Sequence, residues 1–344
     1  MRVGILSSGG DCPGINATIR GVGKTALTHY GMDVIGICDG FQGLLTKEFI
    51  TLDDKSLSGL LSLGGTILGT SREKPFKKLL DKTDDTKTSI IYENYKQLGL
   101  DCLVCIGGNG TQKTAYKVSQ LGLNVIGIPK TIDNDVYGTD FTFGFYSAVD
   151  IATEAIDRLH STASSHKRVM VIELMGHKAG WITLYAGMAG GADVILLPEL
   201  GCDMNKVTKA ILNRARKDKP YSIVAVGEGL EFSGGENKTA KDNSLASRIS
   251  RLIEENTGLE TRETILGYVQ RGGSPSPFDR NLATRLGGHA TELIAKGQFG
   301  RMVSLINDKI TSVPLEKVAG KLKLVTPDHD LIIQGKRMGI SFGV

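Results

Sequence analysis

The sequence has no long apolar run and no block of positive charge. No stretch of its 344 residues approaches the length of a membrane-spanning helix, and Val3–Leu6 is typical of a strand rather than of a signal peptide. The 41 basic and 37 acidic residues are spread along the chain and leave a formal net charge of +4. Binding to nucleic acid or to a membrane surface is therefore not indicated, and small anionic substrates are sufficient partners. We expect a cytoplasmic protein.

Cysteine is scarce, and the five cysteines are an odd number. Cys102 and Cys105 form a C-x-x-C motif, but Leu103 and Val104 between them continue a strand, and no second metal-binding pair follows. We therefore expect reduced cysteines, with a metal or redox site as the minor alternative.

Glycine, in contrast, is abundant. The 44 glycines exceed what packing requires and indicate many loops in which the backbone approaches a ligand closely. With 40% hydrophobic residues, the chain can bury a large core and is long enough for two domains.

Two carboxylates separated by an amide follow a short apolar strand. Val125–Ile128 is typical of a buried strand, and Lys130–Asp135, called the aspartate turn below, comes at its carboxyl end, where open α/β sheets bind ligands. One of the two acids, Asp133 or Asp135, can accept a proton from an attacking hydroxyl while the other orients it. Lys130 and Thr131 supply a cation and a hydroxyl donor for a phosphoryl group. An acidic loop that caps the next helix is the alternative.

Three further glycine-rich turns accompany this one, at Ser8–Gly14, Leu63–Arg72 and Gly107–Thr111. A strand, a glycine turn and a helix amino terminus together present backbone N–H groups to a phosphate. The first turn matches neither the dinucleotide fingerprint nor the Walker loop. Arg72 can be aimed at a phosphate or simply be solvated. Several such turns on one sheet are expected to converge on one crevice.

Strands and helices alternate along the whole chain. The expected strands are 3–7, 34–37, 103–106, 125–128, 169–174, 194–197, 223–226, 264–270 and, last, 303–306. The expected helices are 16–30, 112–120, 146–164, one after 181, 205–216 and one that ends near 296. Residues 73–90 are expected to form a loop with a short helix, and residues 231–243 a loop. The alternation predicts the α/β class, with two layered α/β/α domains and mostly parallel sheets.

Four motifs carry a resemblance to a known family. They are Gly107–Thr111, Pro129–Asp135, Met175–His177 and Gln270–Pro275. With these motifs in this order, the chain resembles the phosphofructokinases over nearly its whole length. A motif similar to the first also occurs in lipid and NAD kinases, which form a weaker alternative.

The resemblance implies a fold, a division of the chain and a reaction. The fold is phosphofructokinase-like, with a phosphoryl-donor domain over 1–143 plus 271–325 and a fructose-6-phosphate domain over 144–270 plus 326–344. The implied reaction is the glycolytic transfer of a phosphoryl group from ATP to the 1-hydroxyl of fructose 6-phosphate. In the family, the carboxylate that corresponds to Asp133 is the base, and Asp135 supports it. Thr131 corresponds to a residue that touches the transferred group, and Lys130 completes the implied catalytic set.

The phosphoryl donor is the first open question. On the donor side the resemblance places Gly10, Phe41, Arg72, Gly108, Asn109, Gly110 and Thr111. Phe41 stands where a tyrosine often lies against the adenosine. Glycine at Gly110 leaves room for ATP, whereas aspartate there accompanies pyrophosphate use. Lys130, however, corresponds to a lysine typical of pyrophosphate enzymes, so the chain is similar to a mixed-donor subgroup. We expect ATP, with pyrophosphate as the alternative.

Magnesium is the second open question. Asn109 stands where the family usually has an aspartate that helps to hold Mg²⁺, and its neutral oxygen is a weaker ligand. Either the donor phosphates hold most of the metal, with Asn109 as a weak ligand, or the chain is a catalytically weak regulatory subunit.

The sugar-phosphate side is implied in the same way. The corresponding residues are Arg168, Met175, Gly176, Glu228, Arg262, Tyr268 and Arg271. In the family, Met175–Gly176 and Glu228 correspond to positions that bind the sugar hydroxyls, and Tyr268 stands where histidine is common. Arg271 corresponds to a residue that holds the 6-phosphate, together with Arg168 and Arg262 from a neighbouring subunit. A homo-oligomer with shared active sites, a dimer or a tetramer, is therefore implied.

Overall fold

The computed structural model describes residues 1–73, 75–76, 85–231 and 243–344. The chain forms two compact units, each built from two segments. Unit 1 is Met1–Ser147 with Arg271–Lys323, and unit 2 is Ala148–Gln270 with Leu324–Val344. The chain thus passes between the units at 147/148, 270/271 and 323/324, where the sequence predicts 143/144, 270/271 and 325/326.

Unit 1 contains a seven-stranded sheet. Its strands are β1 (Arg2–Ser8), β2 (Asp33–Ile37), β3 (Phe49–Thr51), β4 (Cys102–Gly107), β5 (Val125–Pro129), β10 (Arg301–Ile306) and β11 (Lys309–Pro314). They lie in the order β11-β10-β5-β4-β1-β2-β3, with parallel pairing except at the two edge strands β3 and β11.

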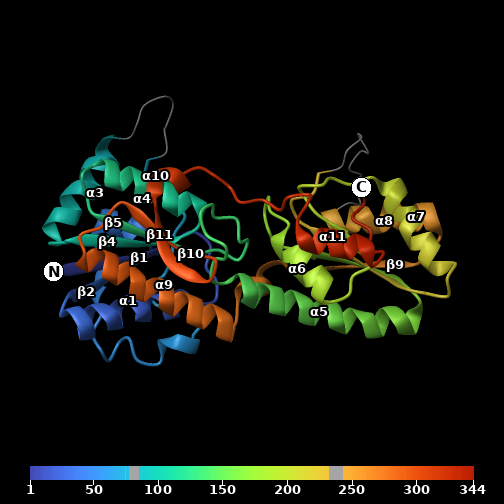
Figure 1. Cartoon of the computed structure of the whole chain (residues 1–344), viewed down its shortest axis with the longest axis horizontal. Coiled ribbons are helices and arrows are strands. Elements are labelled where there is room, and N and C mark those ends of the chain that lie inside the picture. Colours follow the sequence, from blue (N-terminus) through green and yellow to red (C-terminus); the bar gives the residue numbers. More distant parts are fainter. Residues whose placement is uncertain (74, 77–84, 232–242) are drawn as a thin grey trace. The chain divides into compact units, whose positions relative to one another are not determined.

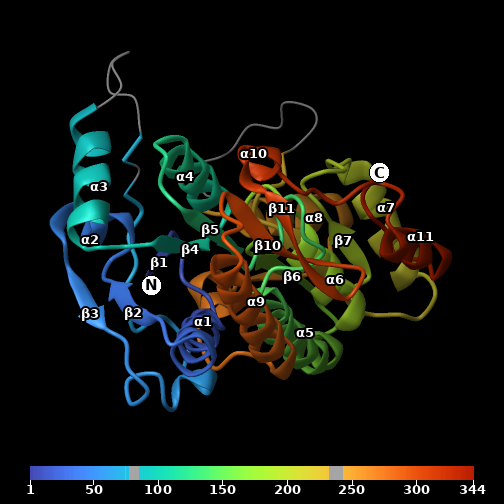
Figure 2. The ribbon, with the colours of Figure 1, turned by 60° about the vertical axis from the view of Figure 1, so that its left-hand side comes forward.

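Helices cover both faces of this sheet (Figure 1, Figure 2). They are α1 (Ile15–Tyr30), α2 (Phe41–Thr46), α3 (Asp85–Gln97), α4 (Asn109–Gln120), α9 (Pro277–Ala295) and α10 (Leu315–Val318), with a short 3₁₀ turn η1 (Leu60–Ser62). Helices α2, α3, α4 and α10 pack on one face through a core that includes Ile91, Tyr95 and Val118. On the other face α1 packs against α9, and Gly21 and Gly287 allow the close approach, because a Cβ at Gly287 would lie 2.8 Å from the carbonyl oxygen of Thr18.

Unit 2 contains a four-stranded parallel sheet in the order β7-β8-β6-β9. Its strands are β6 (Val169–Leu174), β7 (Val194–Leu196), β8 (Ser222–Gly227) and β9 (Thr261–Ile265). The helices are most of α5 (Phe145–His166), α6 (Trp181–Ala189), α7 (Met204–Ala215), α8 (Leu245–Thr257) and α11 (Asp330–Arg337), and the 3₁₀ turn η2 (Gly267–Arg271) leads into unit 1. Leu196 and Val224 face α7 and α8, whereas their strand neighbours Ile195 and Ala225 face Gly187 of α6, so this sheet also lies between two helical layers.

The predicted α/β class with mostly parallel sheets is confirmed, but two predicted strands are wrong in detail. The strand predicted over 264–270 ends at Ile265, because Gly267 has a left-handed φ of +51° and starts a 3₁₀ turn. The strand at 303–306 is not the last one. Asn307 and Asp308, with φ of +49° and +61°, form a two-residue turn that leads back along β11.

Several short or polar elements were not predicted from the sequence. They are α2, β3, α8, α10 and α11. Helix α8 begins at a capping box formed by Ser244 and Ser247. Helix α4 begins at Asn109, three residues before the predicted start, and α3 extends the short helix expected within 73–90 as far as Gln97. The loop expected over 231–243 falls almost wholly outside the described residues.

All five cysteines are free, as expected, and Cys102 and Cys105 are buried in β4. Among the described residues, none of the helices is both long enough and apolar enough to span a membrane.

Candidate active site

Three neighbouring strands of unit 1 end at one edge of the sheet. In the pairing register Ser8 of β1 lies beside Gly107 of β4, and Gly107 lies beside Pro129 of β5. After β1 the chain adds β2 on one side, and it later adds β4 on the other side, so the strand order reverses between β1 and β4. This is the point at which open α/β sheets bind ligands. The predicted convergence of the first and third glycine turns with the aspartate turn is therefore present within unit 1.

The segment that ends in Arg72 is tied to the glycine turn after β1. The backbone N–H of Gly9 donates to the carbonyl oxygen of Ser71 at 2.9 Å, and the Thr70 hydroxyl donates to the carbonyl oxygen of Gly9 at 2.7 Å. These bonds fix the backbone next to Arg72, whose side chain is exposed. Arg72 is thus delivered to the same edge of the sheet as Gly10.

The amino terminus of α4 offers backbone N–H groups at this edge. Its N-cap is Gly108, which has no side chain to accept a hydrogen bond from them, and the first turn has no acidic residue. The Thr111 hydroxyl donates to the carbonyl oxygen of Ser8 at 3.2 Å and fixes the helix start against β1. A Cβ at Gly110 would meet no atom of the described residues within 4 Å. The helix start is therefore open, positively polarised and suited to a phosphate.

Phe41 does not fit the place that the resemblance gives it. Its side chain is only 1% exposed and belongs to the core between the sheet and α2–α4. A phenyl ring held in this way has no face left for an adenosine, so the expected contact of Phe41 with a nucleotide does not follow from this structure.

The aspartate turn is held by its own side chains and by those that follow it. Asn134 has a left-handed φ of +51°, which asparagine tolerates better than most residues. Its side-chain oxygen accepts the Thr142 N–H at 3.1 Å, and the Thr142 hydroxyl donates to the carbonyl oxygen of Thr131 at 2.7 Å. The Thr131 hydroxyl in turn accepts the Asp133 N–H at 3.1 Å. Asp133 and Asp135 thus flank a fixed, left-handed residue, and both are partly buried.

Asn109 links α4 to this turn. Its side-chain nitrogen donates to the Asp135 carboxylate at 2.7 Å and to the Asp135 carbonyl oxygen at 3.3 Å. The side-chain oxygen of Asn109 is buried and has no hydrogen-bond partner among the residues that the structure describes. Such an oxygen is a possible ligand for a hard cation. Among the described residues, however, no group of three or more acidic, histidine or cysteine side chains forms a ready metal cage.

Two cations lie behind the glycine turn that follows β1. Lys130 is 3% exposed and its ammonium donates to the carbonyl oxygen of Gly10, while the Arg271 guanidinium donates to the carbonyl oxygen of Asp11 at 3.3 Å. Burial, reinforced by the nearby charge of Arg271, lowers the pKa of Lys130, and Cys12, Asp133 and Asp11 oppose the shift. Burial also raises the pKa of Cys12 to about 12, so this thiol stays protonated.

The carboxyl edge of the sheet in unit 2 carries other predicted residues. The Glu228 carboxylate accepts the N–H groups of Gly176 at 3.2 Å and His177 at 2.7 Å, and the Gln270 side chain accepts the Met175 N–H at 2.8 Å. The turn after β6 is therefore held by Glu228 after β8 at Gly176 and by Gln270 at Met175. Tyr268 follows β9 and is 76% exposed.

Arg168 and Arg262 lie at the opposite edge of the same sheet. Arg168 directly precedes β6, and Arg262 pairs in register with Met170 near the start of β6. Both arginines bind the Glu260 carboxylate, at 2.8 Å and 2.5 Å. The six residues of β6 separate Arg168 from Met175, a distance of roughly 20 Å at the usual rise along a strand, and Arg262 lies level with the second of these residues. Within one chain, therefore, unit 2 does not bring these arginines to Glu228.

One residue outside the predicted set contacts the aspartate turn: Lys323 donates to the side chain of Asn134. A second long-range contact lies at the start of α5, where Asp279 accepts from Ser147. Neither contact has a local sequence signal, because 189 and 132 positions separate the partners.

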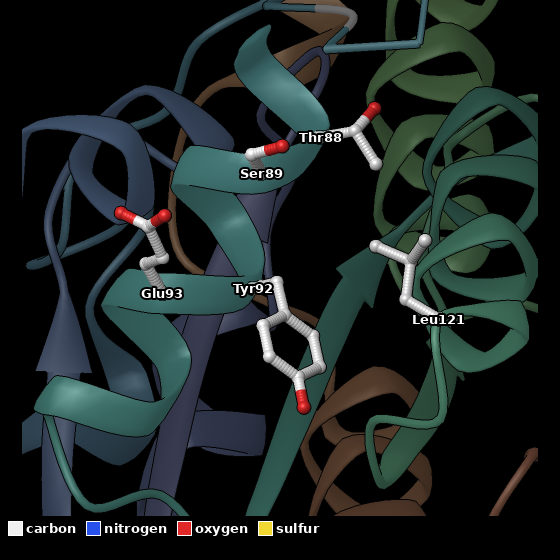
Figure 3. Close-up of a pocket in the computed structure, with 5 residues that line it drawn as sticks. All are labelled: Thr88, Ser89, Tyr92, Glu93 and Leu121. Carbon is white, nitrogen blue, oxygen red and sulfur yellow. The ribbon is translucent and has the colours of Figure 1, made fainter. Parts of the chain in front are cut away.

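A hollow of about 290 Å³ lies elsewhere in unit 1 (Figure 3). It is lined by Thr88, Ser89, Tyr92, Glu93 and Leu121, which come from α3 and from the residue that follows α4. It lies at the carboxyl end of α4, away from Gly108, and takes no part in the site.

Comparison of the sequence with known proteins identifies its family. The family model described as Phosphofructokinase matches residues 2–294. The chain belongs to the phosphofructokinase family. Among curated relatives, "ATP-dependent 6-phosphofructokinase 3" of Bacteroides thetaiotaomicron is 67% identical, with 100% of each chain covered. "ATP-dependent 6-phosphofructokinase" of Spirochaeta thermophila is 54% identical, with 99% of this chain and 97% of the relative covered.

Solved phosphofructokinase structures share the fold. The crystal structure of the pyrophosphate-dependent phosphofructokinase of Marinobacter aquaeolei matches with a TM-score of 0.84 and 25% identity, over 99% of this chain and 88% of that one. The phosphofructokinase fold therefore spans both units of the chain, and named relatives of the family differ in their phosphoryl donor.

Proposed function

We propose that this protein is an ATP-dependent 6-phosphofructokinase, which transfers the γ-phosphoryl group of ATP to the 1-hydroxyl of fructose 6-phosphate. The observation that carries the proposal is the full-length identity of 67% to a relative named as such. The geometry agrees, since a carboxylate pair lies beside an open helix amino terminus and two glycine turns at one edge of the sheet. Phosphoryl transfer needs mainly positioning and charge stabilisation, which this arrangement can supply.

Asp133 is the general base in this proposal. It takes the proton of the 1-hydroxyl as the oxygen attacks phosphorus, and the γ-phosphoryl passes to that oxygen while ADP leaves. Asp135 is held by Asn109 and keeps the turn oriented. Thr131 has its hydroxyl next to the Asp133 backbone, where it can also donate to the transferred group.

Lys130 has an indirect role in this proposal. Because its ammonium is buried and bound to the carbonyl oxygen of Gly10, it holds the donor turn and supplies positive charge behind it, rather than reaching out to the phosphates. Gly10, Gly108 and Thr111 supply backbone contacts to the phosphates, and Arg72 adds an exposed cation.

ATP is the proposed donor because of the open space at Gly110 and because of the relatives. In the part of the chain that the structure describes, no atom lies within 4 Å of a Cβ built at Gly110, which leaves room for an α-phosphate. An aspartate at this position would fill that space and bring a negative charge. Lys130 remains compatible with pyrophosphate, the donor named for the Marinobacter aquaeolei protein, so pyrophosphate is the second candidate.

Magnesium fits the site only together with the phosphates. The buried Asn109 side-chain oxygen is an available but neutral ligand, and Mg²⁺ commonly combines few protein ligands with substrate phosphates and water. When bound, the ion would neutralise charge on the donor phosphates. Asn109 would hold it on the protein side.

Unit 1 is then the phosphoryl-donor unit and unit 2 the sugar-phosphate unit. Glu228 and the Met175–Gly176 turn bind the sugar hydroxyls, Tyr268 supplies a hydroxyl, and Arg271 binds the 6-phosphate. Arg168 and Arg262, at the far edge of the unit 2 sheet, serve the site of a neighbouring copy. This proposal requires a homo-oligomer, and we place it in the cytoplasm with the other reactions of soluble sugar phosphates.

Parallel initial rates test the proposal. Purified protein with Mg²⁺ and fructose 6-phosphate receives either ATP or pyrophosphate, and formation of the bisphosphate is measured. We expect turnover with ATP and little with pyrophosphate. Turnover with pyrophosphate alone selects the second candidate, and binding of fructose 6-phosphate without turnover on either donor selects a regulatory subunit.

A further inference from the structure

A partly buried ammonium is bonded to the aspartate turn. The Lys323 side chain donates to the side-chain oxygen of Asn134 at 2.9 Å and to the carbonyl oxygens of Thr139 at 3.0 Å and Asp140 at 2.6 Å. These three acceptors match the three N–H donors of an ammonium. One side chain thus connects the left-handed residue between the two aspartates to the segment that follows the turn.

The backbone of the same segment is also tied to the turn. The Lys323 N–H donates to the carbonyl oxygen of Asp135 at 2.8 Å, and Leu322 forms an antiparallel bridge with Val136. Lys323 is the last residue of unit 1 before the chain passes to unit 2. The aspartate turn therefore has backbone and side-chain support from a strand-like segment that is remote in the sequence.

The environment of Lys323 disfavours its charged form. Burial lowers the pKa of Lys323 to about 8, and the carboxylates of Asp140 and Asp135 only partly oppose the shift. A lowered folded-state pKa means that the charged form is less favourable in the folded protein than in the unfolded chain. Features that lower stability in this way are expected where function requires them.

We propose that Lys323 is a positioning residue for phosphoryl transfer, which fixes the conformation of Asn134 and with it the orientation of Asp133 and Asp135. The proposal rests on the proposed function of Asp133 as the base. Lys323 does not itself touch a substrate. Because Asn134 has a left-handed backbone, loss of its side-chain anchor would let the turn relax and move both neighbouring carboxylates.

Protonation of Lys323 then affects the rate. A neutral amine has two N–H donors for three oxygen acceptors and no charge, so the anchor weakens as the pH rises through about 8. The carboxylates of Asp140 and Asp135 act on the ammonium and favour its charged form. Turnover of the native enzyme is therefore expected to decline above this pH.

The test uses the full-length enzyme with Lys323→Met, Lys323→Arg and the neighbouring control Lys321→Met. Lys321 lies in the same segment, but its side chain is exposed and lies over the Tyr137 ring. For Lys323→Met we expect kcat to fall by about 10- to 100-fold, as for a small misplacement of catalytic groups, with both KM values nearly unchanged. Lys321→Met should behave as wild type. Lys323→Arg should keep most of the turnover at pH 7 and should hold it above pH 8, because arginine does not titrate there.

Two results would overturn the proposal. The first is a wild-type kcat in folded Lys323→Met. The second is an alkaline decline in Lys323→Arg that coincides with that of wild type, and this second result decides the matter even if Lys323→Met does not fold. A wild-type enzyme without phosphofructokinase activity would instead reject the proposed function, so the two failures can be told apart.

Discussion

The carboxyl edges of the two sheets are built with opposite chemistry. In unit 1, cationic side chains bind backbone carbonyl oxygens: Lys130 binds Gly10, Arg271 binds Asp11, and Lys323 binds Asp140. In unit 2, acidic and amide side chains bind backbone N–H groups. Glu228 accepts from His177, Gln270 from Met175, and Glu199 from Gly180 at 2.9 Å and Val325 at 2.9 Å.

This difference determines what each edge can bind. In unit 1 the N–H groups at the start of α4 have no side-chain cap, because the N-cap is Gly108, and the cations add positive charge where phosphates are expected. At the unit 2 edge the turn N–H groups already have carboxylate or amide partners, so the turn presents polar groups suited to neutral hydroxyls. Arg168 and Arg262 lie at the other edge of the unit 2 sheet.

Under the proposed function, the comparison therefore separates a self-sufficient edge from an incomplete one. The proposed base, the glycine turns and the cations of unit 1 lie together in one chain. In the same proposal, unit 2 relies on Arg168 and Arg262 of a neighbouring copy to help hold a phosphate at its carboxyl edge. Changes at the first edge should act on turnover within one subunit, whereas changes at the second should act on affinity and across subunits.

The largest effect is expected at the base. Asp133→Asn keeps the size of the side chain and removes its basicity, so kcat should fall by about 10² to 10⁴, the range usual for a general base. The KM for fructose 6-phosphate should change little, because Asp133 is not proposed to hold the sugar. Steady-state kinetics with ATP measure both constants.

Asp308→Asn is the matched control for this substitution. Asp308 lies in the β10–β11 turn, its side chain is 93% exposed, and asparagine suits its left-handed backbone. Wild-type kinetics are expected. If Asp133→Asn mainly weakens sugar-phosphate binding, the base lies elsewhere and the self-sufficiency of the unit 1 edge fails.

The next effect tests whether the unit 2 edge is completed by a second chain. Arg262→Ala should lower kcat/KM for fructose 6-phosphate by about 10- to 100-fold through loss of a charge-assisted hydrogen bond. When this variant is refolded together with Asp133→Asn, mixed oligomers should contain sites in which both residues are intact. For random pairing in a symmetric dimer, activity should return to about a quarter of the wild-type value.

The control for the mixing experiment is a pair from one chain. Arg271 and Asp133 both lie near Lys130 in unit 1, so Arg271→Ala mixed with Asp133→Asn leaves no site with both residues intact. No recovery is expected there. Equal recovery in the two mixtures, or none in the first, would contradict the assignment of Arg262 to a neighbouring subunit.

Sequence patterns predicted the structure correctly where a single residue type determines the local backbone, as glycine does at a turn. The glycine turns after β1 and β4 and the aspartate turn after β5 could be predicted, because apolar runs mark strands and glycines mark their ends. The short strand β11 was missed because its polar residues lack a strand pattern. The burial of Phe41 was also missed, since a resemblance gives a position in an alignment and not the packing around it.

Contacts between distant segments were beyond the reach of the sequence. The Lys323 anchor joins residues 189 positions apart, and a lysine in a segment with two other lysines looks like a solvated charge. The placement of Arg168 and Arg262 at the far edge of β6 likewise requires the strand register. The roles of these side chains depend on which strands pair, which local patterns do not determine.

The last effect concerns stability rather than turnover, at the start of α5, where unit 1 passes to unit 2. The buried Asp279 carboxylate accepts the Ser147 N–H at 2.8 Å and the Ser147 hydroxyl at 2.6 Å, and burial raises the pKa of Asp279 to about 6 despite these bonds. Because the folded pKa lies above the ordinary value of 3.8, this group contributes stability at low pH that is lost as the pH rises through about 6.

Asp279→Asn removes this titration. Between pH 4 and pH 7 the free energy of unfolding of wild type should therefore fall relative to that of the variant, by up to about 3 kcal/mol for a shift of two pKa units. Urea unfolding at a series of pH values measures the difference, in which other titrating groups cancel. Asp53→Asn is the opposite control, because hydrogen bonds from Ser56 lower the pKa of the exposed Asp53. The free energy of unfolding of wild type should therefore rise relative to that of this variant as the pH rises. If the difference in the free energy of unfolding between wild type and Asp279→Asn does not change with pH, Asp279 ionises as easily in the folded chain as in the unfolded one. Burial in unit 1 would then not disfavour the ionised carboxylate.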